Sequence, residues 1–118
     1  MQWSQIGAGF GFLGVLLGAF GAHGLHDKLT AAGRLDTWEK AVFYHLVHAV
    51  VLLVISWRSA NPPRVACWAM TVGMTIFSGS LYLLCLSGVK MLGAVTPLGG
   101  LAFLVGWGAL CLPAKQRA

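Results

Sequence analysis

The stretch that decides the fold is residues 3–22, which read WSQIGAGFGFLGVLLGAFGA. It contains no charged side chain. As a helix rising about 1.5 Å per residue it would be about 30 Å long, which matches the hydrocarbon core of a bilayer. No Lys or Arg precedes it, and it is longer than the apolar core of about 7–15 residues in a signal peptide. We therefore predict a first membrane span that stays in the mature protein.

Five glycines in this span recur at alternating steps of four and three residues. This spacing places them on one stripe of a helix and creates the small-xxx-small pairs that let helices pack closely in membranes. The five are Gly7, Gly11, Gly14, Gly18 and Gly21. We expect a neighbouring helix to approach this stripe closely, and the stripe suggests a surface for a protein partner.

The whole chain has the composition of a membrane protein. Of its 118 residues, 58% are hydrophobic and 9% are charged, whereas soluble domains carry about 25% charged residues. A soluble fold of this size could not bury so much apolar surface, and the chain is too short for two separate cores. We therefore predict an all-α membrane protein, a four-transmembrane-helix bundle that forms one domain over residues 1–118.

The other three apolar segments lie at about residues 37–57, 65–86 and 92–112. The polar connection between the first two spans predicts a short helix at the membrane surface, ended by Gly33. Near the last span, either a helix begins at Thr96 and Pro97, with Thr96 as its N-cap, or a longer helix is kinked there. We favour a kinked or broken start, because a helix from Pro97 alone would be only about 24 Å long.

The second span carries signals for a helix start and for membrane interfaces. Asp36 and Glu39 have the spacing of a capping box, in which each side chain bonds an early backbone amide. Trp38 and Trp57 are nineteen residues apart, or about 28 Å along a helix. We therefore expect each tryptophan to lie in an interfacial aromatic belt.

The charges and cysteines indicate that the lipid bilayer is the main partner. The formal net charge is +5, but the basic residues occur singly or in pairs at segment ends. This pattern anchors helices to anionic lipid and does not resemble a nucleic-acid interface, so no nucleic-acid partner is expected. The cysteines lack the spacing of a disulfide framework or metal site, and we expect all three to be buried as small hydrophobic residues. They are Cys67, Cys85 and Cys111.

The distribution of Lys and Arg gives a weak guide to orientation. With four spans, both termini share a side with the second loop, and the basic residues are divided equally between the two sides. They are Arg58, Arg64, Lys115 and Arg117 on the side of the termini, and Lys28, Arg34, Lys40 and Lys90 on the other. The terminal amine adds to the first side, so we predict both termini in the cytoplasm.

Two histidines in the second span are the leading candidates for chemistry. His45 and His48 are three residues apart and share a helix face, and Tyr44 precedes His48 by one turn. An ionisable side chain near the bilayer midplane suggests a functional site. With His23 and the nearby His26 they could converge on a metal, a haem or a proton relay. Alternatively, neutral histidines simply hold helices in register through hydrogen bonds.

Hydroxyl groups extend this candidate polar face to the later spans, at Ser78, Tyr82 and Thr96. A serine nucleophile is not expected, because its strand-to-helix elbow is missing. All three carboxylates lie in the first connection, which excludes carboxylate-pair catalysis within the bilayer. Further positions are predicted to serve helix packing, namely Gly79, Pro97, Gly99 and Gly100.

Several segments together resemble a known family, the YgdD-like small membrane proteins, or domain-of-unknown-function family 423. They are residues 18–25 (GAFGAHGL), 44–49 (YHLVHA), 77–84 (FSGSLYLL), 96–100 (TPLGG) and the Gly106-Trp107 pair. The resemblance implies a multi-pass bacterial inner-membrane protein with four helices and no established activity. It adds weight to His23, Tyr44, His48, Ser78 and Tyr82 as site residues, and to the Thr96-Pro97 pair.

We expect a non-enzymatic membrane protein that needs no cofactor and acts through helix contacts, as a homo-oligomer or as an accessory subunit of a membrane complex. One alternative is a small conduit or carrier for a proton, a metal or a small amphiphile. Another is a metal or haem site built on His45 and His48.

Overall fold

The computed structural model describes residues 2–113, and these residues are all helix and short connections. The helices are α1 (Trp3–Ala22), α2 (His26–Ala31), α3 (Leu35–Trp57), α4 (Arg64–Gly73), η1 (Met74–Ser78), α5 (Gly79–Ser87) and α6 (Leu92–Leu110). The short π-helix η1 joins α4 and α5 into one rod, Arg64–Ser87. Within the described part of the chain, four rods are long and apolar enough to cross a membrane, which confirms the predicted fold class.

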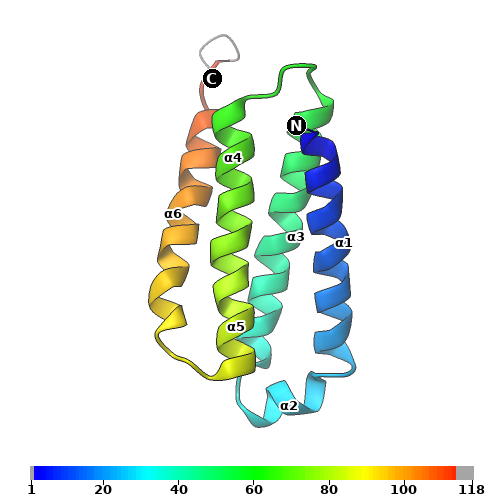
Figure 1. Ribbon diagram of the computed structural model, residues 1–118, viewed down its shortest axis with the longest axis vertical. Coiled ribbons are helices and arrows are strands. Elements are labelled where there is room, and N and C mark those ends of the chain that lie inside the picture. The colour runs from blue at the N-terminus through cyan, green and yellow to red at the C-terminus, as the bar shows by residue number, and fades with distance from the viewer. Residues whose placement is uncertain (1, 114–118) are drawn as a thin grey trace.

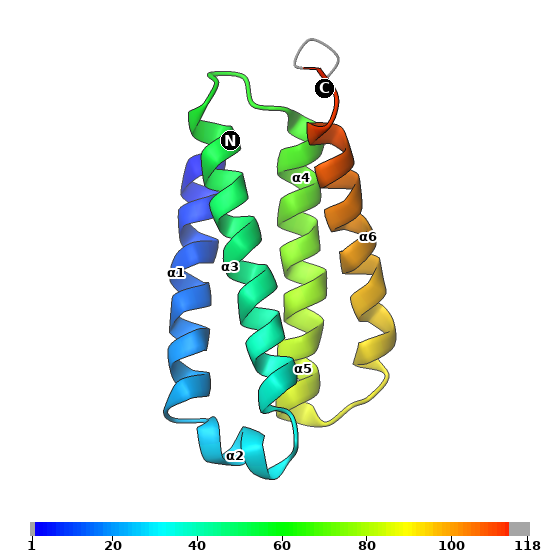
Figure 2. The ribbon, with the colours of Figure 1, turned by 180° about the vertical axis from the view of Figure 1, so that it is seen from behind.

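The four rods lie side by side in the order in which they follow one another in sequence (Figure 1). The α3 helix packs between α1 and the α4–α5 rod, and α6 packs on the far side of that rod. Figure 2 shows the same order from behind, with α2 crossing the end of the bundle. The two ends of the described chain lie together with the α3–α4 loop, opposite α2 and the α5–α6 loop.

The glycine stripe of α1 is covered by α3 of the same chain. A Cβ atom added at Gly14 would lie 2.6 Å from Leu46 Cδ2, and one added at Gly21 would overlap the Trp38 indole. Added Cβ atoms at Gly7 and Gly18 would lie 3.1 and 3.2 Å from α3 side chains. Nothing lies within 4 Å of one at Gly11, so this glycine does not share in the packing expected of the stripe.

A second glycine contact joins α6 to the α4–α5 rod. A Cβ atom at Gly99 would overlap the backbone of Phe77 in η1, and one at Gly73 would overlap the Phe103 ring. Gly100 has only an ordinary contact of 3.9 Å, whereas Gly79 has none within 4 Å. Close packing of α6 therefore depends on Gly99 and Gly73, and Gly79 was wrongly assigned to helix packing.

The core consists of two clusters, one toward each end of the bundle. Nearest the termini, Leu52, Met70, Met74 and Phe103 are among the buried residues. At the other end, Leu29 of α2 packs with Trp38 and its neighbours. The buried Leu29 holds α2 against the end of the bundle, while the rest of that short helix is exposed. Gly33 follows α2 with a positive φ of 71°, as its role in ending the helix requires.

Some expectations for α3 were wrong. The helix begins at Leu35, so Asp36 lies within its first turn and makes no capping bond. Instead, the Asp36 carboxylate pairs with Lys40 Nζ at 3.0 Å. Trp38 is only 1% exposed, and its indole N–H donates to the Leu17 carbonyl of α1 at 2.9 Å. Trp38 is therefore a packing residue and lies in no lipid-facing belt, whereas Trp57 is exposed as expected.

The last span follows the alternative in which a longer helix contains the proline. The α6 helix begins at Leu92 and continues without a break through Pro97, so Thr96 is not its N-cap. The Thr96 hydroxyl lies 3.2 Å from the Leu92 carbonyl of the preceding turn. Pro97 is exposed and so does not serve the interhelix packing predicted for it. Cys111, which was expected to be buried, is also exposed, unlike the other two cysteines.

Candidate functional site

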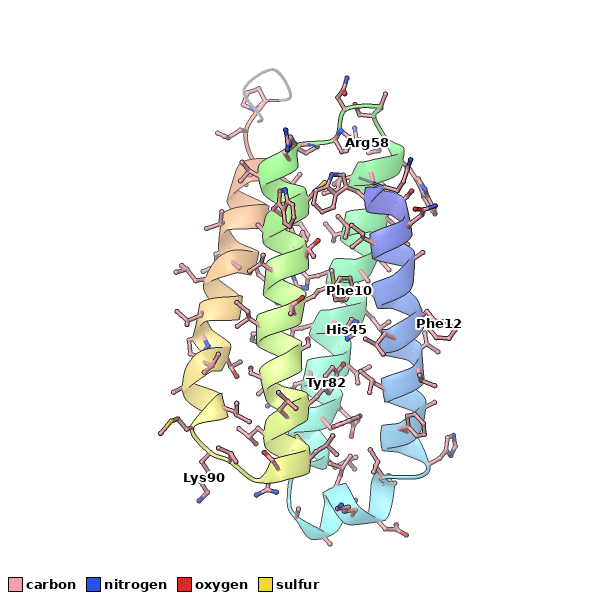
Figure 3. All side chains as sticks on the ribbon, in the orientation of Figure 1. Phe10, Phe12, His45, Arg58, Tyr82 and Lys90 are labelled. Carbon is pink, nitrogen blue, oxygen red and sulfur yellow. The ribbon has the colours of Figure 1, made fainter. Side chains whose placement is uncertain are left out.

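His45 links α3 to two other helices inside the bundle. It is buried, and its Nδ1 lies 2.9 Å from the Tyr82 hydroxyl of α5. The Phe10 ring of α1 meets the imidazole edge to face, with ring centroids 5.7 Å apart. Figure 3 shows these three side chains between α1 and the α4–α5 rod. His45 Nε2 is buried without a hydrogen-bond partner among the described residues, although the Phe10 main chain lies close to the ring.

His48 forms hydrogen bonds through both ring nitrogens, and its two partners determine which nitrogen carries the proton. Nδ1 lies 2.7 Å from the Tyr44 carbonyl, and Nε2 lies 3.1 Å from the Trp107 indole nitrogen of α6. A carbonyl can only accept and an indole N–H can only donate. Nδ1 therefore carries the proton, and the Nε2 lone pair accepts from Trp107. The Phe103 ring stacks on the imidazole, with centroids 3.7 Å apart. His48 is thus neutral and fully bonded.

Two buried serine hydroxyl groups of the α4–α5 rod, one from the candidate Ser78 and one from Ser80, also bond across helices. Ser78 Oγ–H donates to the Ala41 carbonyl of α3 at 2.8 Å. Ser80 Oγ lies 2.6 Å from Thr96 Oγ1 of α6. Since an unpaired hydroxyl is costly away from water, such bonds favour one arrangement of the helices.

The candidate residues do not gather into one site. Three positions along a helix turn a side chain by about 300°, so His45 and His48 point about 60° apart. Because α3 lies among the other rods, this angle directs His45 toward α1 and α5 and His48 toward α6. His23 and His26 are exposed at the end of the bundle. Residues 2–113 contain no group of three His, Cys, Asp or Glu that could hold a metal ion, so of the two alternatives for the histidines, convergence of the four imidazoles on one site is not what the structure has.

Sequence reasoning missed the aromatic partners of the polar residues. Phe10, Phe103 and Trp107 each contact a buried histidine, but none was named as a candidate. Of these three residues, only Trp107 could have been proposed from the sequence, because it belongs to a segment that resembles the family. Tyr44, which was named, is partly exposed; its backbone carbonyl accepts from His48, and its ring packs against Phe77 with centroids 4.7 Å apart.

Comparison with known proteins agrees with this fold. Residues 17–100 match the family model described as a protein of unknown function, DUF423. A UPF0382 membrane protein of Staphylococcus epidermidis is 44% identical over 116 residues, covering 96% of this chain and 94% of that protein. The UPF0382 membrane protein YwdK of Bacillus subtilis is 42% identical over 107 residues, covering 86% of each chain. No solved structure matches. The resemblance drawn from the sequence segments is thereby confirmed, and the chain belongs to the DUF423 family, whose relatives named above are membrane proteins.

Proposed function

We propose that this membrane protein is non-enzymatic and acts through contacts with other proteins in the bilayer, as a homo-oligomer or as an accessory subunit of a larger complex. The observation that carries the proposal is the bonding of the polar interior. His48 uses both nitrogens, and Ser78 and Ser80 bond to groups on other helices. Side chains engaged in this way hold the bundle together and are poorly placed to bind or transform a substrate.

The surface for such contacts differs from the one suggested by the sequence. Because α3 covers most of the glycine stripe, a partner would have to approach the outer faces of α1 and α6. Phe12 of α1 is 74% exposed and Leu104 of α6 is 69% exposed, and Figure 3 shows Phe12 directed away from the bundle. On the same helices, nothing lies within 4 Å of a Cβ atom added at Gly9 or Gly108. Open glycines beside large apolar side chains suit close packing with another helix.

Photocrosslinking in native membranes tests this proposal. A benzophenone amino acid replaces Phe12 in one variant and Leu104 in another, and Phe103, which is 5% exposed, provides the control beside Leu104. We expect protein adducts of discrete mass from at least one outward position and none between chains from Phe103. If both outward positions give only lipid adducts, contact with a protein partner is refuted.

The conduit hypothesis receives less support. A transbilayer path for protons or metals needs polar groups in succession, but the two buried histidines point toward different helices and His48 is already bonded. Purified protein in vesicles provides a direct check through proton or metal flux. Flux that is lost on His48→Ala would favour the conduit over the contact proposal.

We also propose that the membrane is the bacterial plasma membrane, with both termini in the cytoplasm. Bacterial relatives named as membrane proteins support the location. Arg58 and Lys90 mark opposite ends of the bundle in Figure 3, so they report the orientation. Lys115 and Arg117, which entered the charge count, lie outside the described residues.

A further inference from the structure

A groove of about 590 Å³ lies between α1 and α3 at the α2 end of the bundle. This volume falls within the range of about 300–1,000 Å³ that is usual for small-molecule sites. On the α3 side it extends from Leu35 to Leu46, which is about 16 Å along the helix axis. The groove therefore runs from the membrane surface into the depth of the acyl chains.

The groove exists because α1 carries small residues there. Gly18, Gly21 and Ala22 form its α1 side, while Val42 and Phe43 contribute the opposite wall on α3. Phe43 is largely exposed, so this wall is open to lipid. An apolar cleft that opens sideways to the bilayer suits an acyl chain better than a water-soluble molecule.

Polar side chains occur only at the surface end of the groove. The groove has ten lining residues, and among them only His26, Glu39 and Trp38 carry a polar group on the side chain. The Trp38 indole N–H is already hydrogen-bonded to the Leu17 carbonyl of α1, which leaves His26 and Glu39. Within the described residues, Glu39 forms no ion pair, because the adjacent Lys40 pairs with Asp36 instead. The Arg34 side chain is also directed elsewhere, since its guanidinium lies beside Gly88.

We propose that this groove binds one bilayer lipid with an ammonium headgroup. Its acyl chain would lie against the small residues of α1, and its ammonium would pair with the Glu39 carboxylate. The apolar depth selects an amphiphile, and the unpaired carboxylate at the mouth selects a positive group on the head. This inference is independent of the contact proposed above, because it concerns the cleft between α1 and α3 and not the outward glycines.

Native mass spectrometry of the full chain in detergent tests the proposal. Phosphatidylethanolamine and phosphatidylglycerol with identical acyl chains are added in turn. We expect one tightly held phosphatidylethanolamine, preferred by up to about fivefold, which corresponds to the upper end of about 1 kcal/mol for an exposed charge pair. Glu39→Gln should abolish the preference. Asp36→Asn combined with Lys40→Gln is the control, since it removes the neighbouring ion pair as a whole, leaves Glu39 in place and should preserve the preference.

A second pair of variants tests the apolar part of the groove without altering charge. Ala22→Phe would fill the groove from its exposed edge and should weaken binding of both lipids about tenfold or more. Ala19→Phe adds the same ring one turn earlier on α1, outside the groove, and should leave binding unchanged. Circular dichroism checks that each variant is helical.

The outcomes separate cleanly. The proposal is overturned if Glu39→Gln and the control with both Asp36→Asn and Lys40→Gln give the same lipid preference, or if Ala22→Phe binds as well as Ala19→Phe. It is also overturned if phosphatidylglycerol is preferred or if no lipid remains bound. Should Glu39→Gln fail to fold, the alanine pair still decides whether the groove is occupied, and the wild-type preference decides the headgroup.

Discussion

Replacing Gly99 by alanine tests whether α6 is held in place by the closeness of two backbones. A Cβ atom at Gly99 would overlap the Phe77 backbone nitrogen and would lie 2.7 Å from Cα and Cβ of the same residue. An ordinary contact begins at 3.4 Å, so α6 or η1 must move by at least about 0.7 Å. The Phe77 backbone cannot rotate out of the way as a flexible side chain can, so α6 or η1 must shift as a whole.

Such a shift would have a calculable cost. The hydrogen bond from Trp107 to His48 is 3.1 Å long, and 0.7 Å more would take it past hydrogen-bonding range. Overpacking costs about 1–3 kcal/mol, and alanine returns up to about 1 kcal/mol through its better helix propensity. We expect Gly99→Ala to lower the free energy of unfolding by about 2 kcal/mol.

The neighbouring glycine provides the control. A Cβ atom at Gly100 meets only Phe77 Cδ2 at 3.9 Å, so Gly100→Ala should be neutral or slightly stabilising. Reversible unfolding in mixed micelles, driven by sodium dodecyl sulfate and followed by circular dichroism, measures both variants. If Gly99→Ala proves as stable as Gly100→Ala, the close backbone contact does not hold α6 and the reasoning is refuted.

Three further measurements probe other parts of the molecule. Trp107→Phe leaves His48 Nε2 without its donor and should lower the free energy of unfolding by about 0.6–2 kcal/mol. A double-mutant cycle with His48→Phe should show that the two substitutions are coupled, whereas additive effects would contradict the hydrogen bond. Gly21→Ala should destabilise by about 1–3 kcal/mol by displacing the indole beneath it, in the same unfolding assay, and an unchanged midpoint would contradict this. In a cysteine-free background, an impermeant thiol reagent on intact spheroplasts should label Lys90→Cys but not Arg58→Cys, and the reverse pattern would place the termini outside.

Hydropathy was sufficient to predict the four rods, because the bilayer sets both their length and their composition. Residues 3–22 were expected as a span, and α1 has those bounds. The end of α2 was also readable, since only Gly33 fits the left-handed turn there. Local chemistry of this kind depends on a few neighbouring residues, all of them visible in sequence.

The partners of the interior side chains could not be read in the same way. His48 and Trp107 are 59 positions apart, and nothing local to either one specifies that they meet. The same limit applies to Trp38: its position near a helix start suggested an interfacial belt, but Gly21 leaves space for the indole and Leu17 supplies an acceptor. Where a side chain faces depends on which helix lies next to it, and that order was not predictable from hydropathy.

The two glycine contacts explain how so small a bundle can be both tightly packed and unfilled at one edge. Glycines at buried positions let α1 approach α3, and α6 approach the α4–α5 rod, closely enough for Trp38 to bond Leu17 and for Ser80 to bond Thr96. At the surface end of α1, Gly18 and Gly21 pack against Val42 and Trp38 of α3. Together with Ala22 they also line the groove. Small residues therefore have two effects at this end of the helix: they let side chains of α3 pack closely against α1, and they leave a cleft beside that contact. A substitution that fills the groove at Ala22 should spare the bundle, whereas one that adds bulk at Gly21 should not, although the two positions are adjacent in sequence.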